Sequence, residues 1–399
     1  MKSISKLGQS IQPSLTLALT AKAKKMKSQG EDVISFTAGE PDFNTPENIC
    51  NAGIEAINKG LTKYTVASGM DELKEAIVNK LSSENNLEYT KSQIIVSNGA
   101  KHSLFNVLFA LCNEGDDVIL PSPYWVTYPE LIKLVGANPI IIETSESNGF
   151  KVTIDQLNKI DPTKVKAIII NNPNNPTGAV YSKKELEDIG NWCVKHDIYI
   201  IADEIYEKLV YDGINFVSMA NINDDIKDRT IIINGMSKTF SMTGWRIGYI
   251  ASNNDAVIRV ISGLQSHMTS NPCSISQYAS VVALEDSDEF ILSMKTTFEK
   301  RRNLMLSLVN DIKEVSCEKP EGAFYIMLNI QNVIGKTIAG KVINNSIDFA
   351  DVLLDEAKVS VVPGVGFGAE GFVRLSYSIS EKDIEEGIKR IKDLLSTMR

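Results

Sequence analysis

Short apolar runs alternate along the chain with longer stretches in which apolar residues recur at helical spacing. Seven of the runs are predicted to be strands: Gln93–Ser97, Asp117–Leu120, Pro139–Ile142, Val165–Asn171, Ile198–Ala202, Thr230–Ile233 and Arg246–Ala251. Most of these runs are unbroken rather than alternating, which is typical of strands buried on both faces of a parallel sheet. The pattern therefore predicts a large α/β domain over residues 46–299, in which helices flank a mostly parallel seven-stranded sheet.

The pattern changes after a helical region rich in Arg and Lys, Lys295–Asn310. Three further strands are predicted beyond it, at Ala323–Met327, Lys358–Val362 and Gly371–Tyr377. The last helix is predicted to start at Ser380, because Asp383 follows three residues later as in a capping box. Residues 300–399, together with the N-terminal arm of residues 1–45, are therefore predicted to form a smaller α/β domain. At the end of that arm, Thr45 is predicted to cap a helix whose first residue is Pro46.

Composition and charge narrow the function classes. The 399 residues are 43% apolar and 23% charged, as in ordinary soluble globular proteins, and the net charge of −9 argues against nucleic acid as a partner. The five cysteines and three histidines are too scattered to predict a disulfide framework or a metal site. No stretch approaches the ~18 apolar residues of a membrane span. The basic cluster Lys22–Lys27 follows the apolar segment Leu15–Ala21, the wrong order for a secretory signal, so we expect a cytoplasmic protein.

Reactive side chains follow three of the predicted strands. The strand that ends at residue 171 is followed by Asn175, the strand that ends at residue 202 by Asp203 and Tyr206, and the strand that ends at residue 233 by Lys238. The carboxyl ends of parallel strands lie at one edge of a sheet, where open α/β proteins bind ligands. An amide, a carboxylate, a phenol and an amine are therefore predicted to surround one ligand. At such a place the lysine would be partly desolvated, which lowers its pKa and frees an amine nucleophile.

Pyridoxal phosphate needs this set of groups. Its aldehyde needs a lysine for a Schiff base, and its ring nitrogen needs a carboxylate that keeps the ring protonated as an electron sink. Its ring oxygen needs donors such as Tyr206 and Asn175, and its ring face needs an aromatic platform, for which Trp125 is a candidate. Its phosphate needs cations, hydroxyls and helix N–H groups, which are predicted from Arg246, Ser237, Gly99, Ala100 and Lys101.

Each of these residues also has a plainer interpretation when it is taken alone. Asp203 fits a helix N-cap, Asn175 a turn, Tyr206 and Trp125 a hydrophobic core, and Lys238 a solvated loop. Arg374, in the predicted strand Gly371–Tyr377, is a further candidate and fits the solvated face of that strand. The joint pattern is much more specific than any single member.

At this point the sequence resembles the class I pyridoxal-phosphate-dependent aminotransferases, and among them the bacterial aspartate aminotransferases. The resemblance runs nearly end to end and implies the type I fold of pyridoxal-phosphate-dependent transferases. It rests on segments that occur in the family's order and at its spacing: Ala38–Phe43, Lys63–Tyr64, Ser122–Val126, Asn174–Ala179, Asp203–Glu207, Ser237–Lys238, Met242–Tyr249, Pro320–Tyr325 and Val373–Tyr377.

The resemblance implies a role for each matched residue. Lys238 would bind the cofactor and shuttle the proton between the substrate's α-carbon and the cofactor. Asp203 would pair with the ring nitrogen, while Tyr206 and Asn175 would bond the ring oxygen. Trp125 would stack on the ring. Arg374 would hold the substrate α-carboxylate, helped by Asn175 and by the backbone of Gly39. Tyr64 would reach the cofactor phosphate of the neighbouring subunit. The last role implies a homodimer with shared active sites.

The resemblance also bears on the substrate. Animal-type relatives grip the acidic side chain with an arginine that is lacking in Gln265–Thr269. Bacterial relatives use a lysine instead, at the position of Lys101, near Ser14 and Thr16, so amino transfer from L-aspartate to 2-oxoglutarate by a ping-pong mechanism is predicted. Gln12 replaces a basic residue found in relatives that also use prephenate, which weakens that activity.

Other functions remain open at this point. They are an aminotransferase with aromatic, alanine or prephenate specificity, or a carbon–sulfur lyase of the same fold. Some transcription regulators carry an aminotransferase-like domain behind a DNA-binding domain. The acidic chain, whose arm begins almost at Met1, disfavours that class.

Overall fold

A seven-stranded sheet forms the centre of the computed structural model, which describes residues 3–5, 8–9, 11 and 15–399. Its strands lie in the order β2-β8-β7-β6-β5-β3-β4. Their bounds are β2 (Ile94–Ser97), β3 (Asp117–Ser122), β4 (Asn138–Glu143), β5 (Val165–Asn171), β6 (Tyr199–Asp203), β7 (Thr230–Gly235) and β8 (Gly248–Ala251). Strand β8 is antiparallel to both of its neighbours, and the other adjacent pairs are parallel. The predicted mostly parallel α/β sheet is thus confirmed.

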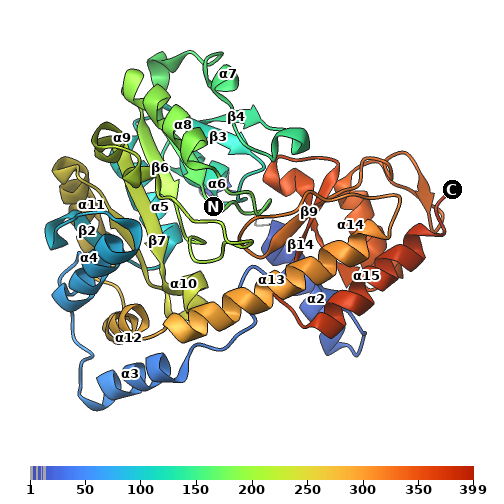
Figure 1. Cartoon of the computed structure of the whole chain (residues 1–399), viewed down its shortest axis with the longest axis horizontal. Coiled ribbons are helices and arrows are strands. Elements are labelled where there is room, and N and C mark those ends of the chain that lie inside the picture. Colours follow the sequence, from blue (N-terminus) through green and yellow to red (C-terminus); the bar gives the residue numbers. More distant parts are fainter. Residues whose placement is uncertain (1–2, 6–7, 10, 12–14) are drawn as a thin grey trace.

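Helices cover both faces of this sheet (Figure 1). Ile169 and Ile201 belong to a core shared with the helices of one face, whereas Ile168 and Ile200 belong to the core of the opposite face. The first face carries α5 (Ala100–Leu111), α6 (Tyr128–Leu134) and α11 (Asp255–Met268). The second face carries α4 (Asp71–Asn85), α7 (Ile154–Leu157), α8 (Lys183–Lys195), α9 (Asp224–Arg229) and α12 (Ser274–Glu285). Helix α3 (Glu47–Asn58) packs on α12. Because side chains alternate across a strand, an unbroken apolar run serves both cores.

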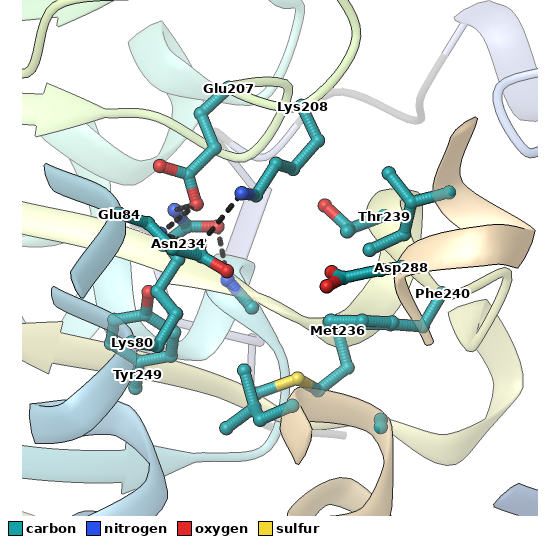
Figure 2. Close-up of a pocket in the computed structure, with 14 residues that line it drawn as sticks. Lys80, Glu84, Glu207, Lys208, Asn234, Met236, Thr239, Phe240, Tyr249 and Asp288 are labelled. Atoms are coloured by element: carbon teal, nitrogen blue, oxygen red, sulfur yellow. Dashed lines mark hydrogen bonds and ion pairs between the residues drawn. The ribbon is translucent and has the colours of Figure 1, made fainter. Parts of the chain in front are cut away.

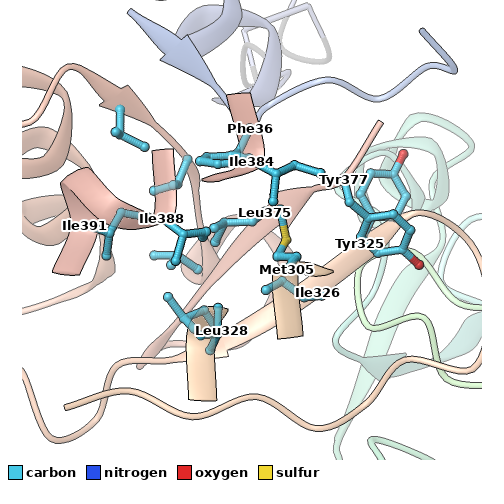
Figure 3. Packing of buried hydrophobic residues seen from close by; sticks show 14 of the residues in the cluster. Phe36, Met305, Tyr325, Ile326, Leu328, Leu375, Tyr377, Ile384, Ile388 and Ile391 are labelled. Carbon is cyan, nitrogen blue, oxygen red and sulfur yellow. The ribbon is translucent and has the colours of Figure 1, made fainter. Parts of the chain in front are cut away.

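A second, smaller group of elements is built from both ends of the chain. Its three-stranded antiparallel sheet has the order β13-β14-β9, and β1 pairs with β12. Its elements are β1 (Ile34–Ser35), β9 (Tyr325–Asn329), β12 (Val359–Ser360), β13 (Val362–Pro363), β14 (Phe372–Ser376), the short pair β10 (Thr337–Ile338) and β11 (Lys341–Val342), and helices α2 (Leu15–Ser28), α14 (Ser346–Glu356) and α15 (Glu381–Leu395). Figure 3 shows Phe36 from the arm packed against Ile384 and Leu375, so the N-terminal segment and the C-terminal elements share one core.

Helix α13 (Asp288–Asn310) connects the two groups and runs along both of them in Figure 1. The boundary predicted between residues 299 and 300 falls inside this continuous helix. The division into a large and a small domain stays a prediction.

Three predicted boundaries differ from the structure for local reasons. The strand predicted from Arg246 begins at Gly248, because Arg246 has a φ of 60° and follows a 3₁₀ turn. The predicted cap Thr45 is wrong, because α3 begins after Pro46 and the Thr45 hydroxyl instead donates to the Ser241 carbonyl at 2.7 Å. The strand predicted at Lys358–Val362 is two short strands, β12 and β13. The predicted cap at Ser380 is confirmed, since its Oγ accepts from the backbone N–H of Asp383 at 3.1 Å.

Candidate active site

The three strand ends named by the sequence lie side by side in the sheet. Asp203 is the last residue of β6 and pairs with Asn171 of β5 and with Ile233 of β7. Lys238 follows in the one-turn helix α10 (Met236–Thr239). This edge of the large sheet faces the small group of elements, since the side chains of Arg374 and Tyr325, from β14 and β9, reach it. The structure thus brings the predicted amine, carboxylate, phenol and amide together.

The ammonium of Lys238 is packed beside aromatic rings and forms no ion pair with a carboxylate of the described residues. Its Nζ is 5.8 Å from the ring centre of Tyr206 and 5.7 Å from that of Phe324, and it donates to the carbonyl of Gly39. Burial disfavours the charged form and lowers the pKa of Lys238 to about 8, although Glu40 opposes this shift. About a tenth of this amine is therefore uncharged at pH 7, far more than for an exposed lysine.

The carboxylate of Asp203 is buried and has a phenol as its main partner. The hydroxyl of Tyr128 donates to Asp203 Oδ2 at 2.6 Å, and the backbone N–H of Ile205 donates to Oδ1 at 3.3 Å. Burial raises the pKa of Asp203 to about 6, while the Tyr128 hydrogen bond works in the opposite direction. The N-cap interpretation of Asp203 is not what the structure has, since no helix begins there. Sequence reasoning missed Tyr128, whose position three residues after Trp125 was the available signal.

Arg374 is a buried cation, not a residue on a solvated strand face. Only 3% of it is exposed, and its Nη1 donates to Asn175 Oδ1 at 3.0 Å while Nη2 donates to the Thr37 carbonyl at 3.2 Å. The guanidinium lies 4.3 Å from the ring centre of Tyr325 and 5.0 Å from that of Phe367. Among the described residues no carboxylate is within ion-pair distance, and the buried Nε has no partner. Such a cation is ready to receive an anion.

The hydroxyl of Tyr206 meets the hydroxyl of Tyr325 at 3.0 Å, and both side chains are buried. Tyr325 therefore joins the predicted ring-oxygen donor to the predicted carboxylate grip, a role that sequence reasoning missed. A signal was available, because Tyr325 lies diagonally across β9 and β14 from Arg374, which pairs with Met327.

A second cation lies at the amino end of helix α5. Gly99 precedes the helix with a φ of 84°, and the Arg246 side chain lies against it, donating to the Thr243 carbonyl at 2.8 Å and to the Asn98 carbonyl at 3.4 Å. A Cβ at Gly99 would fall 2.3 Å from Arg246 Nη2, so only glycine leaves room for this approach. The N–H groups of the helix start and the guanidinium together form an anion cradle. Ser237 is buried in α10, next to Lys238.

Trp125 and Lys101 form the wall beside Tyr128. The Trp125 ring packs edge-on against Tyr128 with ring centres 5.5 Å apart, and Lys101 Nζ lies 4.8 Å from the Trp125 ring. Burial, and then Arg246, lower the pKa of Lys101. The local charge at this end of an acidic protein is thus positive.

One predicted residue, Tyr64, is not brought into this set. Tyr64 lies at the surface with 88% exposure. Ser14 lies outside the described residues, and so does the side chain of Thr16, although its backbone belongs to α2. Within the described part of the chain, no cluster of three His, Cys, Asp or Glu side chains suits a metal ion, and every helix is too short or too polar to cross a bilayer.

Comparisons with known proteins agree with this geometry. The model of the class I and II aminotransferase family matches residues 31–391. An aspartate aminotransferase of Bacillus subtilis is 48% identical over 380 residues, which are 95% of each chain, and a probable aspartate/prephenate aminotransferase of Rickettsia bellii is 46% identical over 384 residues, 96% of each. The crystal structure of an aspartate aminotransferase from Rhizobium meliloti is 39% identical, superposes with a TM-score of 0.96 and covers 100% of both chains. The protein therefore belongs to the class I and II aminotransferases.

Proposed function

We propose that this aminotransferase uses pyridoxal phosphate to move the amino group of L-aspartate to 2-oxoglutarate in two half-reactions, with oxaloacetate and L-glutamate as products. One observation carries the proposal: a lysine of lowered pKa, packed beside the ring of Tyr206, shares one edge of the sheet with the buried carboxylate of Asp203 and with a buried arginine that has no anionic partner among the described residues. The names of the relatives support the choice of aspartate.

The residues present fit the cofactor. The cradle of Gly99 and Arg246 suits its phosphate, Ser237 supplies a nearby hydroxyl, and the carboxylate of Asp203 suits its ring nitrogen. Trp125 would stack on the ring, and Tyr206 and Asn175 would bond the ring oxygen. When bound, pyridoxal phosphate supplies the electron sink that makes the α-hydrogen of an amino acid acidic.

Lys238 is the proposed base that moves this hydrogen. With a pKa near 8, its amine is available as a proton acceptor close to neutral pH, where general bases work best. The ring faces of Tyr206 and Phe324 flank the amine and restrict its path. The carbonyl of Gly39 holds the same amine from the side of the N-terminal segment.

Arg374 is the proposed grip for the substrate α-carboxylate. Its Nη groups already contact Asn175 and Thr37, so its plane is fixed, and the unpartnered Nε can donate to an incoming carboxylate. Fixing the plane beforehand lowers the ordering cost of binding.

Lys101, with Ser14 and Thr16, is the proposed site for the acidic side chain of the substrate. The lysine stands beside Trp125, on the platform proposed for the ring. Because an ammonium is a point charge rather than a fork, we expect looser discrimination than an arginine would give.

We also propose a homodimer with shared sites, in which Tyr64 reaches the neighbouring cofactor phosphate. The 88% exposure of Tyr64 and the 62% exposure of Val66 support this assembly, since large side chains are seldom left so open without a partner. Residues 46–299 would form the large domain, and the small domain would close over the substrate.

The test is a substrate panel on purified protein. Reduction with borohydride in the presence of pyridoxal phosphate should fix the cofactor on the peptide that contains Lys238. Values of kcat/KM for aspartate as the amino donor should exceed those for alanine and phenylalanine, and the value for 2-oxoglutarate as the acceptor should exceed that for prephenate. Lys101→Gln should lower the ratio of aspartate to alanine. A label on another peptide would overturn the cofactor assignment, and pyruvate released from cystathionine as the main activity would favour a lyase.

A further inference from the structure

Four polar residues form a buried network behind the proposed lysine that the reaction does not use. Lys80 and Asn85 come from α4, Glu207 from the turn after β6, and Asn234 from β7. None of them is more than 7% exposed. Figure 2 shows Lys80, Glu207 and Asn234 converging on one another. All three line a cavity of about 20 Å³, which is room for about one water.

The carboxylate of Glu207 is the centre of this network. Its Oε1 accepts from Lys80 Nζ and, at 2.8 Å, from Asn234 Nδ2, and its Oε2 accepts from Asn85 Nδ2 at 2.9 Å. Lys80 also donates to Asn85 Oδ1 at 2.8 Å. Burial alone would raise the pKa of Glu207, but Lys80 and Asn85 outweigh it and hold that pKa below its usual value. The carboxylate is therefore charged and paired.

The network joins the two segments that carry the proposed catalytic groups. Glu207 directly follows Tyr206 and lies four residues after Asp203, and Asn234 lies four residues before Lys238. The Oδ1 of Asn234 accepts the backbone N–H of Gly235 at 2.7 Å. At Gly235 the chain has no side chain to anchor it, because a Cβ there would fall 2.7 Å from Gly248 Cα. The side chain of Asn234 thus links the backbone at the end of β7 to the carboxylate of Glu207.

Stability alone gives little reason for this arrangement. A buried ion pair loses about as much in desolvation as it gains in attraction, and apolar replacement of both partners is often neutral or stabilising. The desolvation cost of such a network is better explained if the network holds the segments around it in one fixed arrangement.

We propose that Glu207, neutralised by Lys80, is a positioning residue that ties the Asp203–Tyr206 segment to the end of β7 through Asn234 and so sets the place of Lys238. This inference rests on the proposed function, because it assigns the network to the site that would hold the cofactor.

Three variants and a matched control test it. The double variant Lys80→Met with Glu207→Leu removes the ion pair as a unit, and Asn234→Ala removes only the arm that reaches β7. The third variant combines all three substitutions. The control Glu84→Gln removes the neighbouring ion pairs of Glu84 with Lys208 at 2.8 Å and with Lys80 at 3.6 Å. This substitution leaves the hydrogen bond between Glu207 and Asn234 in place.

Each protein is unfolded with and without pyridoxal phosphate, and its cofactor dissociation constant is measured. The absorbance of the bound cofactor is also titrated against pH. The unfolding midpoint without cofactor measures the structural effect of each substitution, and the increase on adding cofactor measures the positioning effect.

We expect the dissociation constant to rise about tenfold in the double variant and in Asn234→Ala, the size of one or two charged hydrogen bonds. The triple variant should lose no more than the double variant, because one tie is removed only once. The titration midpoint of the bound cofactor should shift in the same variants, and Glu84→Gln should stay within about twofold of wild type.

Three outcomes would overturn the inference. Variants that lose stability without cofactor, but keep the dissociation constant and the titration midpoint, would make the network purely structural. Wild-type protein that takes up no pyridoxal phosphate would overturn the proposed function and this inference with it. Uptake by wild type and all variants alike would overturn this inference alone.

Discussion

Replacement of Arg374 by methionine should lower activity strongly and change the stability of the protein little. The cation is 97% buried by area and has no carboxylate partner among the described residues, so it pays desolvation without the compensation of an ion pair. Methionine keeps the length and much of the volume of the side chain and carries no charge.

The magnitude follows from the contacts that are lost. The substitution removes two hydrogen bonds, to Asn175 and Thr37, each worth about 1 kcal/mol, and a contact with the ring of Tyr325 worth up to about 2 kcal/mol. It also relieves the desolvation of a buried cation, which costs several kcal/mol. We therefore expect the free energy of unfolding of the cofactor-free protein to change by no more than about 1–2 kcal/mol, in either direction.

Arg302 offers a matched comparison. It is also fully buried, but it donates to Asp212 at 2.7 and 2.9 Å and to the Pro320 carbonyl at 3.0 Å. Loss of one partner of a buried pair costs about 3–5 kcal/mol, and because Asp212 is partly exposed we expect Arg302→Met to fall near the lower end.

Denaturant unfolding of both variants, measured side by side without cofactor, tests the stability difference. The value of kcat/KM for aspartate tests the function of Arg374. Loss of a forked, charged contact should lower it by about ten- to a hundredfold, while the dissociation constant of pyridoxal phosphate stays near wild type. The reasoning is refuted if Arg374→Met unfolds as easily as Arg302→Met, or if kcat/KM is unchanged.

Three further predictions follow from the charges of the site. The cofactor-free protein should gain stability as the pH rises from about 8 towards 10.5, because over this range Lys238 binds a proton in the unfolded protein but not in the folded one. Unfolding measured at several pH values should show a gain of at most about 3 kcal/mol, and Lys238→Met should lack it. Tyr128→Phe removes a hydrogen-bond donor from Asp203 and should raise the pKa of that carboxyl above about 6. The acidic limb of the profile of kcat against pH should then shift to higher pH, and an unmoved limb would contradict this prediction. Lys238→Ala should still bind pyridoxal phosphate but lose at least about 10²-fold in turnover, and wild-type-like turnover would end the proposed mechanism.

The sequence predicted the sheet and the edge that carries the site because both depend on local rules. Unbroken apolar runs predict buried parallel strands, and the carboxyl ends of such strands share an edge, which is how Asp203 and Lys238 were placed near each other. The order of the strands has no such local signal. Strand β8 follows β7 in the chain and pairs with it, but its other neighbour is β2, which is distant in the sequence. Residues of α5 and α11 share a core with this part of the sheet.

The residues that were missed are those whose type has a common alternative use. Tyr128 and Tyr325 belong to apolar patterns, so their positions relative to Trp125 and Arg374 are weak signals that ordinary core aromatics share. Glu207 pairs with Lys80 across 127 positions, a separation that no motif reports. Arg302 lies in a stretch of basic residues that looks solvated, yet it is fully buried. Long-range pairing of charges needs the fold before it can be recognised.

The site collects two groups that are costly to bury, and this cost is part of how it works. Lys238 has a lowered pKa because its ammonium is desolvated, and Arg374 is a buried cation whose only charge compensation among the described residues comes from amide and carbonyl oxygens and aromatic faces. Both costs are present before any ligand binds, so the protein has already desolvated the groups that must meet the cofactor and the substrate carboxylate. An anion that reaches Arg374 relieves part of that cost, and an amino acid without an α-carboxylate relieves none of it. Selection for the α-carboxylate is thus set by the buried, unpaired charge, whereas selection for the side chain depends on the more exposed Lys101, where water competes. Substitutions at Arg374 should therefore weaken all amino-acid substrates alike, and substitutions at Lys101 should change only the ranking among them.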